Sequence, residues 1–283
     1  MARQKRVAAI HDISGFGKCS HTVALPIISA AGIETSVIPT AVLSTHTGGF
    51  TGFTYRDLTE DIRPIAEHWK SLDLNFDSIY TGFLGSFEQI QLIAETFDRL
   101  KSDRTLILVD PVMADNGKLY EIFPSDFPKG MKKLCEKADI IIPNITEATL
   151  MLDEPYFEGP YTHEYIDGLL KRLAAIGADR VVLTGVYFDN KELGAASYDK
   201  KNDQISYAFA DRIEGYYHGT GDVFGSAFLA ALLNDKSLSE ATQIAVNYTV
   251  GSIQRTKDSG TDLRFGVNFE AGIPAFLKSL GLI

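Results

Sequence analysis

His218-Gly219-Thr220-Gly221-Asp222-Val223-Phe224-Gly225-Ser226-Ala227-Phe228 is a glycine-rich turn that runs directly into an apolar helix, with one carboxylate, Asp222, at the junction. The glycines on both sides of Thr220 let backbone N–H groups crowd together because no Cβ obstructs them. A helix that begins near Asp222 aims its unpaired first-turn N–H groups and the positive end of its dipole at the same place. The segment therefore predicts an anion site, and phosphate is the anion that such sites most often hold.

The aspartate at this junction has two interpretations. A carboxylate beside bound phosphate is understandable where it takes a proton from a hydroxyl while the backbone amides stabilise the transferred charge, as in a small-molecule kinase. The alternative is an aspartate that caps a helix after a glycine turn. The segment alone leaves both open. We also expect Gly221 to be required, because a Cβ there would obstruct phosphate or strain a backbone with positive φ.

The composition limits the classes of protein. The chain has 283 residues, of which 45% are hydrophobic, and a formal net charge of −10. This length fits one large α/β domain or two small ones, and we predict a single domain over 1–283. The acidic balance argues against nucleic acid as a partner, and no apolar run is long enough to span a membrane. Cys19 and Cys135 suggest no disulfide framework, and the first residues lack a signal-peptide pattern, so we expect a cytoplasmic location.

Short β-forming runs alternate with amphipathic helices along nearly the whole chain. We predict strands at 6–12, 33–44, 78–83, 105–112, 139–142, 180–184, 194–198 and 205–210. We predict helices at 58–72, 86–101, 128–138, 162–176, 223–233, 238–255 and 269–280, with capping boxes formed by Ser86 with Gln89 and by Ser237 with Glu240. The alternation and the apolar strands predict an α/β fold with a central, mainly parallel sheet flanked by helices on both faces.

Polar residues follow the predicted strands where each one ends. Parallel sheets bind ligands outside the carboxyl ends of their strands, so residues at these ends meet at one edge. Five strand ends contribute candidates in this way, and the anion turn adds a sixth element: Asp12 and Ser14, Ser44 to Thr47, Asp110, Asn144, and Thr184. Together they predict one binding site.

Asp110 and Asn144 among these candidates have structural alternatives. Asp110 either caps nearby amides or acts near phosphate and Mg²⁺, through water because Mg²⁺ retains part of its hydration shell. Asn144 either caps a short helix or contributes to the site, and Glu147, three residues later, offers a second oxygen ligand on the same side.

Three further patterns favour structural interpretations. Gly15-Phe16-Gly17-Lys18-Cys19-Ser20 resembles a dinucleotide fingerprint, but Ser20 replaces the third glycine and no acidic residue ends the next strand. Cys19 and His21 have no second pair at zinc spacing. His46 fits a hydrogen-bonded structural histidine better than a catalyst. We therefore expect neither a dinucleotide nor a zinc ion.

Four motifs taken together resemble the ribokinase-like superfamily, and its pyridoxal kinase branch in particular, over nearly the whole chain. They are Gly219-Thr220-Gly221-Asp222, Asp110-Pro111-Val112-Met113, Ala138-Asp139-Ile140-Ile141-Ile142-Pro143-Asn144 with Glu147, and Leu43-Ser44-Thr45-His46-Thr47. The resemblance implies a ribokinase-like fold and an ATP-dependent kinase that phosphorylates the 5′-hydroxymethyl group of a B6 vitamer: pyridoxal, pyridoxamine or pyridoxine.

The resemblance also implies roles for individual residues. Asp222 would be the general base, and Gly219, Thr220 and Gly221 the anion hole. ATP would lie along this turn, with Asp110, Asn144, Glu147 and Thr184 near its phosphates, and Mg²⁺ would be held by Asp110 and Glu147 through water. Asp12, Ser14, Thr47 and Asp222 would contact the vitamer. We further expect a homodimer.

One departure from the family pattern leaves alternatives open. Pyridoxal kinases usually have a serine where this chain has Asp12, and Asp12-Ile13-Ser14-Gly15-Phe16-Gly17 also resembles the hydroxymethylpyrimidine kinases of thiamine synthesis. This puts the identity of the ring in question, not the reaction. A non-catalytic nucleotide-binding protein of the same fold is a third possibility, against which the intact Asp222 and glycine turn argue.

Overall fold

One nine-stranded sheet organises the part of the chain that the computed structural model describes, residues 3–283. Its strand order is β11-β10-β9-β8-β5-β4-β1-β2-β3. The strands are β1 (Arg6–Ser14), β2 (Glu34–Leu43), β3 (Tyr55–Asp57), β4 (Ser78–Thr81), β5 (Leu106–Val109), β8 (Ile140–Ile141), β9 (Arg180–Val186), β10 (Glu192–Asp199) and β11 (Gln204–Asp211). A separate two-stranded sheet joins β6 (Ala114–Asp115) to β7 (Lys118–Leu119).

The six central strands from β9 to β2 pair in parallel, and the antiparallel strands lie at the two sides. There β10 pairs antiparallel with β9 and β11, and β3 pairs antiparallel with β2. Parallel pairing requires crossover connections, which the intervening helices supply. The prediction of a central, mainly parallel sheet is confirmed.

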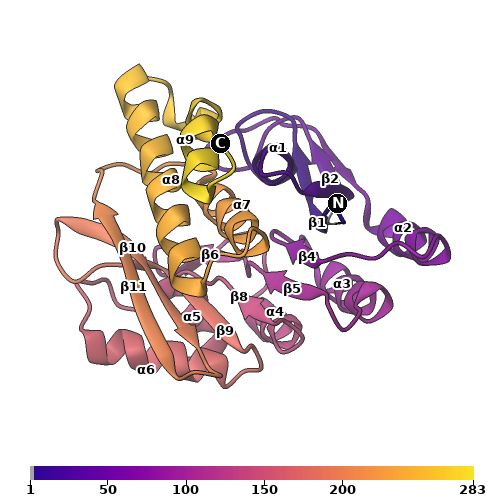
Figure 1. Cartoon of the computed structure of the whole chain (residues 1–283), viewed down its shortest axis with the longest axis horizontal. Helices are drawn as coiled ribbons and strands as arrows, with labels where there is room; N and C mark the ends of the chain where they lie inside the picture. Colours follow the sequence, from indigo (N-terminus) through magenta and orange to yellow (C-terminus); the bar gives the residue numbers. More distant parts are fainter. Residues whose placement is uncertain (1–2) are drawn as a thin grey trace.

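Helices cover both faces of this sheet (Figure 1). On one face lie α1 (His21–Ala30), α7 (Thr220–Leu233), α8 (Leu238–Ser259) and α9 (Ile273–Leu280). On the other lie α2 (Thr59–Ser71), α3 (Phe87–Leu100), α4 (Phe127–Cys135), α5 (Ile145–Leu152) and α6 (His163–Ala174). Two short 3₁₀ turns, Leu263–Phe265 and Glu270–Gly272, precede α9.

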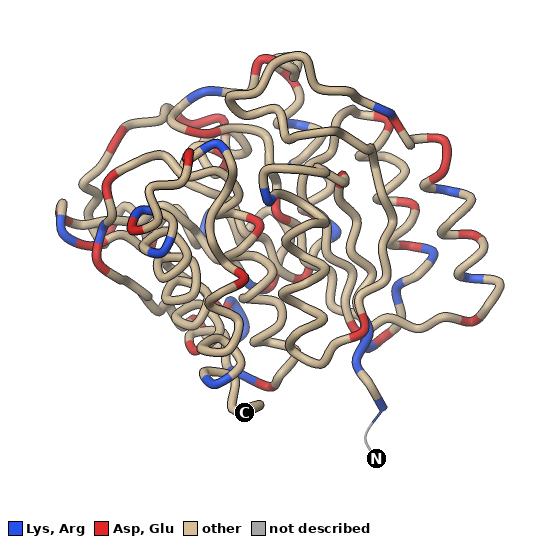
Figure 2. Tube along the Cα trace, turned by 90° about the horizontal axis from the view of Figure 1, so that it is seen from above, with Lys and Arg blue, Asp and Glu red and all other residues tan. Residues whose placement is uncertain are grey.

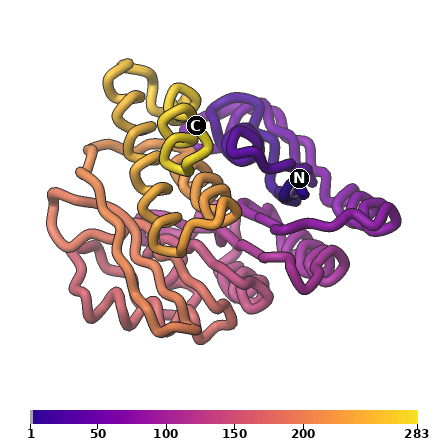
Figure 3. Tube along the Cα trace, in the orientation of Figure 1, coloured from indigo at the N-terminus to yellow at the C-terminus, as the bar shows by residue number. Residues whose placement is uncertain are grey.

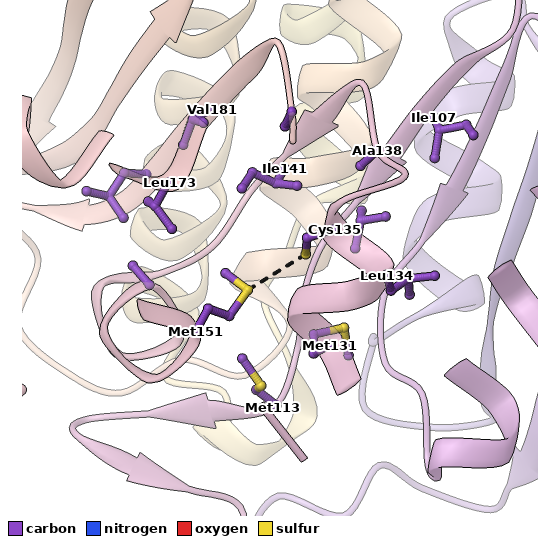
Figure 4. Close-up of a cluster of buried hydrophobic side chains, with 14 of the residues drawn as sticks. Ile107, Met113, Met131, Leu134, Cys135, Ala138, Ile141, Met151, Leu173 and Val181 are labelled. Carbon is purple, nitrogen blue, oxygen red and sulfur yellow. Dashed lines mark hydrogen bonds between the residues drawn. The ribbon is translucent and has the colours of Figure 1, made fainter. Parts of the chain in front are cut away.

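Alternation along β1 divides its side chains between two cores. Ala8 and Ile10 pack in the core under α2 to α6, whereas Val7 and Ala9 pack in the core under α1 and α7. Tyr80 of β4 and Leu108 of β5 belong to the second core. The core under α4 and α5 contains Cys135, whose Sγ lies 3.7 Å from the sulfur of Met151 (Figure 4). Both Cys19 and Cys135 are free cysteines.

The C-terminal helix lies beside an early segment of the chain. Figure 3 shows the yellow C-terminal segment beside the indigo N-terminal one, and α9 contacts α1. Figure 2 shows Lys and Arg interspersed with Asp and Glu over the trace. Within residues 3–283, none of the helices combines the length and the hydropathy needed to cross a membrane.

The structure corrects several predicted elements. Helix α1 was not predicted, because it contains Pro26 and is apolar without a clear polar face. Strands β3, β6 and β7 were also missed, being only two or three residues long. Helix α7 begins at Thr220 instead of 223, so the glycine turn forms its first turn.

Of the two predicted capping boxes, one is complete. Ser237 and Glu240 form it as predicted. Ser86 accepts the Gln89 N–H, but Gln89 Oε1 accepts from the Gly85 N–H at 2.8 Å and not from Ser86. The reason is burial: the Gln89 amide donates to the Thr40 carbonyl and the Thr59 hydroxyl, which draws the side chain toward β2 and α2.

Candidate active site

The carboxyl ends of the central strands and the N-terminus of α7 bring the predicted residues to one edge of the sheet. Asp12 and Ser14 lie in the last residues of β1, Asp110 directly follows β5, and Asn144 follows β8. Asn144 pairs in parallel with Thr184 of β9 through an isolated β-bridge, so these two residues are neighbours across the sheet. The geometry expected for the strand ends is therefore present.

The two glycines of the anion turn differ in their backbone conformation and in the space around them. Gly219 is the N-cap of α7 with φ 77°, and an ideal Cβ there would lie 2.2 Å from the Lys18 carbonyl oxygen. Gly221 lies inside the first turn, and no heavy atom comes within 4 Å of its ideal Cβ. Positive φ, one of the two reasons expected for Gly221, does not apply to it and is found at Gly219. Open space above Gly221 leaves the approach to the first-turn N–H groups free.

Asp222 is the third residue of α7 and is partly buried. The N-cap position belongs to Gly219 and has no side-chain cap, so the alternative in which Asp222 caps the helix is wrong. Burial raises the pKa of Asp222 to about 7, a hydrogen bond from the Ser20 backbone opposes this rise, and the Asp12 charge adds to it. A base whose pKa lies near neutral pH is well matched to accepting a proton from an alcohol.

Asp12 organises the loop that follows β1. Its carboxylate is buried and accepts hydrogen bonds from the Ser14 hydroxyl at 2.8 Å and the Ser20 hydroxyl at 2.5 Å. Burial raises its pKa, and the two serine hydrogen bonds oppose the rise. Ser20 has φ 57°, so the loop returns to Asp12 through a left-handed residue. Sequence reasoning missed Ser20, although its replacement of the third glycine in the motif was a usable signal.

Asn144 and Glu147 form a complete capping box at the start of α5. Glu147 Oε2 accepts the Asn144 N–H at 2.9 Å, and Oε1 accepts the Met113 N–H at 3.1 Å. The Asn144 side-chain amide donates to the Ala114 carbonyl at 2.8 Å. These bonds hold the segment after β5 against α5, next to Asp110.

The Asp110 and Glu147 carboxyls are buried close enough to affect each other. Burial, followed by the charges of Glu147 and Asp222, raises the pKa of Asp110 well above its usual range. Burial also raises the pKa of Glu147 to about 8, against hydrogen bonds from three backbone N–H groups. Among the described residues, 3–283, no three His, Cys, Asp or Glu side chains are close enough together to hold a metal ion by themselves.

His46 is hydrogen-bonded through both ring nitrogens, as expected of a structural histidine. Its Nδ1 accepts the Gly48 N–H at 3.0 Å, so the proton lies on Nε2, which donates to the Arg264 carbonyl at 2.7 Å. The ring lies 4.9 Å from the ring of His218, which immediately precedes the anion turn. His46 therefore holds the loop after β2 beside that turn, with Thr47 exposed next to it.

Comparison with known proteins identifies the family to which the chain belongs. The family model described as phosphomethylpyrimidine kinase matches residues 25–265. The chain belongs to this family. A family member from Bacteroides thetaiotaomicron, crystallised with pyridoxal, is 36% identical and has a TM-score of 0.92, with 97% of this chain and 96% of that chain covered. Pyridoxal kinase from Lactobacillus plantarum is 30% identical, with 98% of both chains covered and a TM-score of 0.89.

A curated relative agrees with these structures. Pyridoxal kinase PdxY of Haemophilus influenzae is 28% identical, covering 89% of this chain and 88% of its own length. The predicted ribokinase-like fold, the pyridoxal kinase resemblance and the enzyme class, an ATP-dependent phosphotransferase, are confirmed for this phosphomethylpyrimidine kinase family member.

Proposed function

We propose that this kinase transfers the γ-phosphoryl group of ATP to the 5′-hydroxymethyl group of a B6 vitamer. The observation that supports this most directly is Asp222, a carboxylate with a pKa of about 7 in the first turn of α7, beside open backbone N–H groups at Gly221. The pyridoxal kinases among its relatives, and the relative crystallised with pyridoxal, supply the substrate class.

Each part of the turn has a distinct role in this proposal. Asp222 removes the proton of the hydroxymethyl group as its oxygen attacks phosphorus, a contribution of roughly 10²–10⁴ in rate. The N–H groups of Gly219, Thr220 and Gly221 stabilise the charge on the transferred phosphoryl group. Asn144 and Thr184, neighbours across β8 and β9, lie along the same edge and contact the nucleotide phosphates.

The vitamer ring occupies the side of the site formed by β1 and β2. Thr47 is exposed beside the fixed His46, and contacts the ring substituents. Asp12 and Ser14 lie at the end of β1 and are joined by a hydrogen bond of 2.8 Å. A buried carboxylate that already accepts two serine hydroxyls has lone pairs left for a ring hydroxyl or an amine.

The carboxylate pair Asp110 and Glu147 fits a cation of the Mg²⁺ type. Both pKa values are raised, so nearby positive charge would stabilise the ionised forms. Both Glu147 oxygens already accept backbone N–H groups, which favours contact through water. When bound, Mg²⁺ neutralises phosphate charge and polarises the phosphoryl oxygens.

Hydroxymethylpyrimidine is the second candidate substrate. The description of the matching family and the presence of Asp12 in place of serine favour it. A panel of pyridoxal, pyridoxine, pyridoxamine and hydroxymethylpyrimidine, each with ATP and Mg²⁺, separates the two by comparing kcat/KM. We expect a B6 vitamer to have the highest value. A higher kcat/KM for hydroxymethylpyrimidine would reverse the assignment. If none of the four compounds led to ADP release, both candidate functions would be contradicted.

We also propose that the chain acts as one domain over 1–283, as a homodimer, in the cytoplasm. Analytical ultracentrifugation of the purified chain tests the dimer, and limited proteolysis tests the single domain. A sedimentation coefficient that corresponds to a monomer at all concentrations would contradict the homodimer.

A further inference from the structure

A layer of buried polar rings lies directly beneath the proposed site. On the face of the sheet that α1 and α7 cover, the side chains of Val7 and Ala9 are followed along β1 by His11. On β4 the side chain of Tyr80 occupies the same core, and Gly82 follows it. An ideal Cβ at Gly82 would lie 2.7 Å from His11 Nδ1, so the glycine makes room for the histidine.

These rings form a column that joins two helices. His21 of α1 lies 5.2 Å from His11 between ring centroids, and His11 lies 4.5 Å from Tyr80, both in edge-to-face geometry. The backbone N–H of His11 donates to His21 Nε2 at 3.2 Å. The exposed fractions are 3% for His21 and 0% for His11 and Tyr80, so the column is closed from solvent. It begins at the helix that follows the Asp12 loop.

The other end of the column is the Tyr80 hydroxyl, which meets the backbone of α7. An ideal Cβ at Gly225 would lie 2.4 Å from this oxygen, closer than real Cβ contacts allow. Gly225 and Ser226 follow Asp222 by three and four residues, so all three share one face of α7. Tyr80 of the sheet therefore contacts α7 one helical turn after Asp222.

The Tyr80 hydroxyl is a buried polar group at the contact with α7. It faces Ser226, yet neither oxygen has a hydrogen-bond partner of acceptable geometry within the described chain. A buried donor without a partner destabilises the folded state, and a phenyl ring would fill the same volume without that cost. Such an unsatisfied group calls for an explanation other than stability.

We propose that Tyr80 is a positioning residue for phosphoryl transfer: the ring column His21–His11–Tyr80 supports α7 at Gly225 and thereby sets the position of Asp222 relative to Asp110. This rests on the proposed role of Asp222 as the base. Tyr80 contacts the substrates at no point in this proposal, so it affects turnover and leaves binding unchanged.

A double-mutant cycle tests the contact. Tyr80→Phe removes the supporting oxygen and should lower kcat about 10-fold, while the KM values stay within about 2-fold and the melting temperature is unchanged or higher. Gly225→Ala pushes α7 away from the sheet and should lower kcat by roughly 10²-fold. In the double variant the Cβ no longer meets the oxygen, and the nearest atom becomes Cζ of the ring at position 80, which lies 3.2 Å away in the wild-type structure. We expect its kcat to return to that of Tyr80→Phe alone.

Two matched variants control for general effects. Tyr248→Phe removes a buried hydroxyl that donates to the Phe269 carbonyl at 2.9 Å, and should lower the melting temperature but keep kcat. Gly251→Ala adds a methyl group to α8, where only the flexible end of Arg255 lies near, and should leave kcat as it is.

Three outcomes would overturn the proposal: wild-type kcat in Tyr80→Phe, independent effects of Tyr80→Phe and Gly225→Ala in the double variant, or equal losses in kcat and in substrate affinity. Failure of the proposed base has a different signature. In that case Asp222→Asn keeps its turnover, while the rescue of Gly225→Ala by Tyr80→Phe still appears in the melting temperatures.

Discussion

Gly219 lies so close to Lys18 that a Cβ at position 219 would meet the Lys18 carbonyl oxygen at 2.2 Å. This contact joins the loop after β1 to the first turn of α7, although the two segments are far apart in sequence. In the same loop, the Ser20 hydroxyl donates a hydrogen bond to the Asp12 carboxylate. The anion turn and the loop after β1 are thus in direct contact, while Gly221, two residues on, borders open space.

That difference predicts opposite behaviour for two alanine variants. Gly221→Ala should fold as stably as wild type, or more so by about 0.5–1 kcal/mol, because alanine favours a helix. Its methyl group would occupy the space proposed for phosphate, so the KM for ATP should rise and kcat should fall. Gly219→Ala should instead lower the melting temperature. The checks are steady-state kinetics and thermal unfolding of both variants; an unchanged ATP KM and kcat in Gly221→Ala would make the turn purely structural.

For the proposed base, Asp222→Asn should lower kcat by roughly 10²–10⁴ and leave the affinity for ATP near that of wild type. In the wild-type enzyme the carboxyl must be ionised to accept a proton. Because its pKa is raised to about 7, kcat should fall as the pH drops through that value. A pH profile of kcat measures this, and near-normal turnover in the variant removes Asp222 from this role.

The same carboxyl makes a prediction about stability. Its pKa is about 7 in the folded chain against an ordinary 3.8, so the folded state retains a proton that the unfolded state releases at lower pH. The contribution of this group to stability therefore decreases as the pH rises from about 3.8 to about 7. Asparagine does not ionise, so Asp222→Asn should melt at a higher temperature than wild type at pH 8, with a smaller difference at pH 4. Equal melting curves at pH 8 would contradict the raised pKa.

The sequence was sufficient for those features that are local. Apolar strands, the Gly219–Asp222 turn and the polar strand ends follow from short patterns, and the sheet brings them together as expected. The requirement for glycine at position 219 and the role of Ser20 depend on a positive φ and on contacts between segments that are distant in sequence. No short pattern encodes either feature. The contact of Tyr80 with Gly225 is of the same kind: both residues resemble ordinary members of an apolar strand and helix.

The carboxylate pair predicts a dependence on Mg²⁺. Asp110→Asn and Glu147→Gln should each raise the Mg²⁺ concentration that gives half-maximal activity, because each removes negative charge where the pKa values are raised. Glu147→Gln should also lower the melting temperature, since an amide has only one oxygen, whereas Glu147 uses one oxygen for the Met113 N–H and the other for the Asn144 N–H. Asp98→Asn, which breaks an exposed ion pair with Lys137, is the control. A Mg²⁺ titration identical to that of wild type in Asp110→Asn defeats the assignment.

The last prediction is that Asp12 helps to determine which vitamer ring the enzyme prefers. If the carboxylate contacts the vitamer, Asp12→Ser should change the ratios of kcat/KM among pyridoxal, pyridoxine and pyridoxamine and leave the ATP parameters nearly unchanged. Loss of a charged hydrogen-bond partner costs on the order of 1.5–3 kcal/mol, or about 10- to 150-fold for the vitamer that uses it. The structure supplies the competing explanation, because Asp12 accepts the Ser14 and Ser20 hydroxyls.

If Asp12 acts only through those two serines, Ser20→Ala should reproduce the defect of Asp12→Ser. Both variants would then melt at a lower temperature. In Ser20→Ala the buried Asp12 carboxylate loses a hydrogen-bond donor, and in Asp12→Ser the loop at Ser20, which has a positive φ, loses its acceptor. All vitamers would suffer to the same degree. Melting temperatures and vitamer ratios, measured on the same preparations, separate the two explanations. A changed ratio in Asp12→Ser with an unchanged ratio in Ser20→Ala assigns the ring contact to the carboxylate; uniform losses in both variants make Asp12 a support of the loop and leave hydroxymethylpyrimidine as strong a candidate as the vitamers.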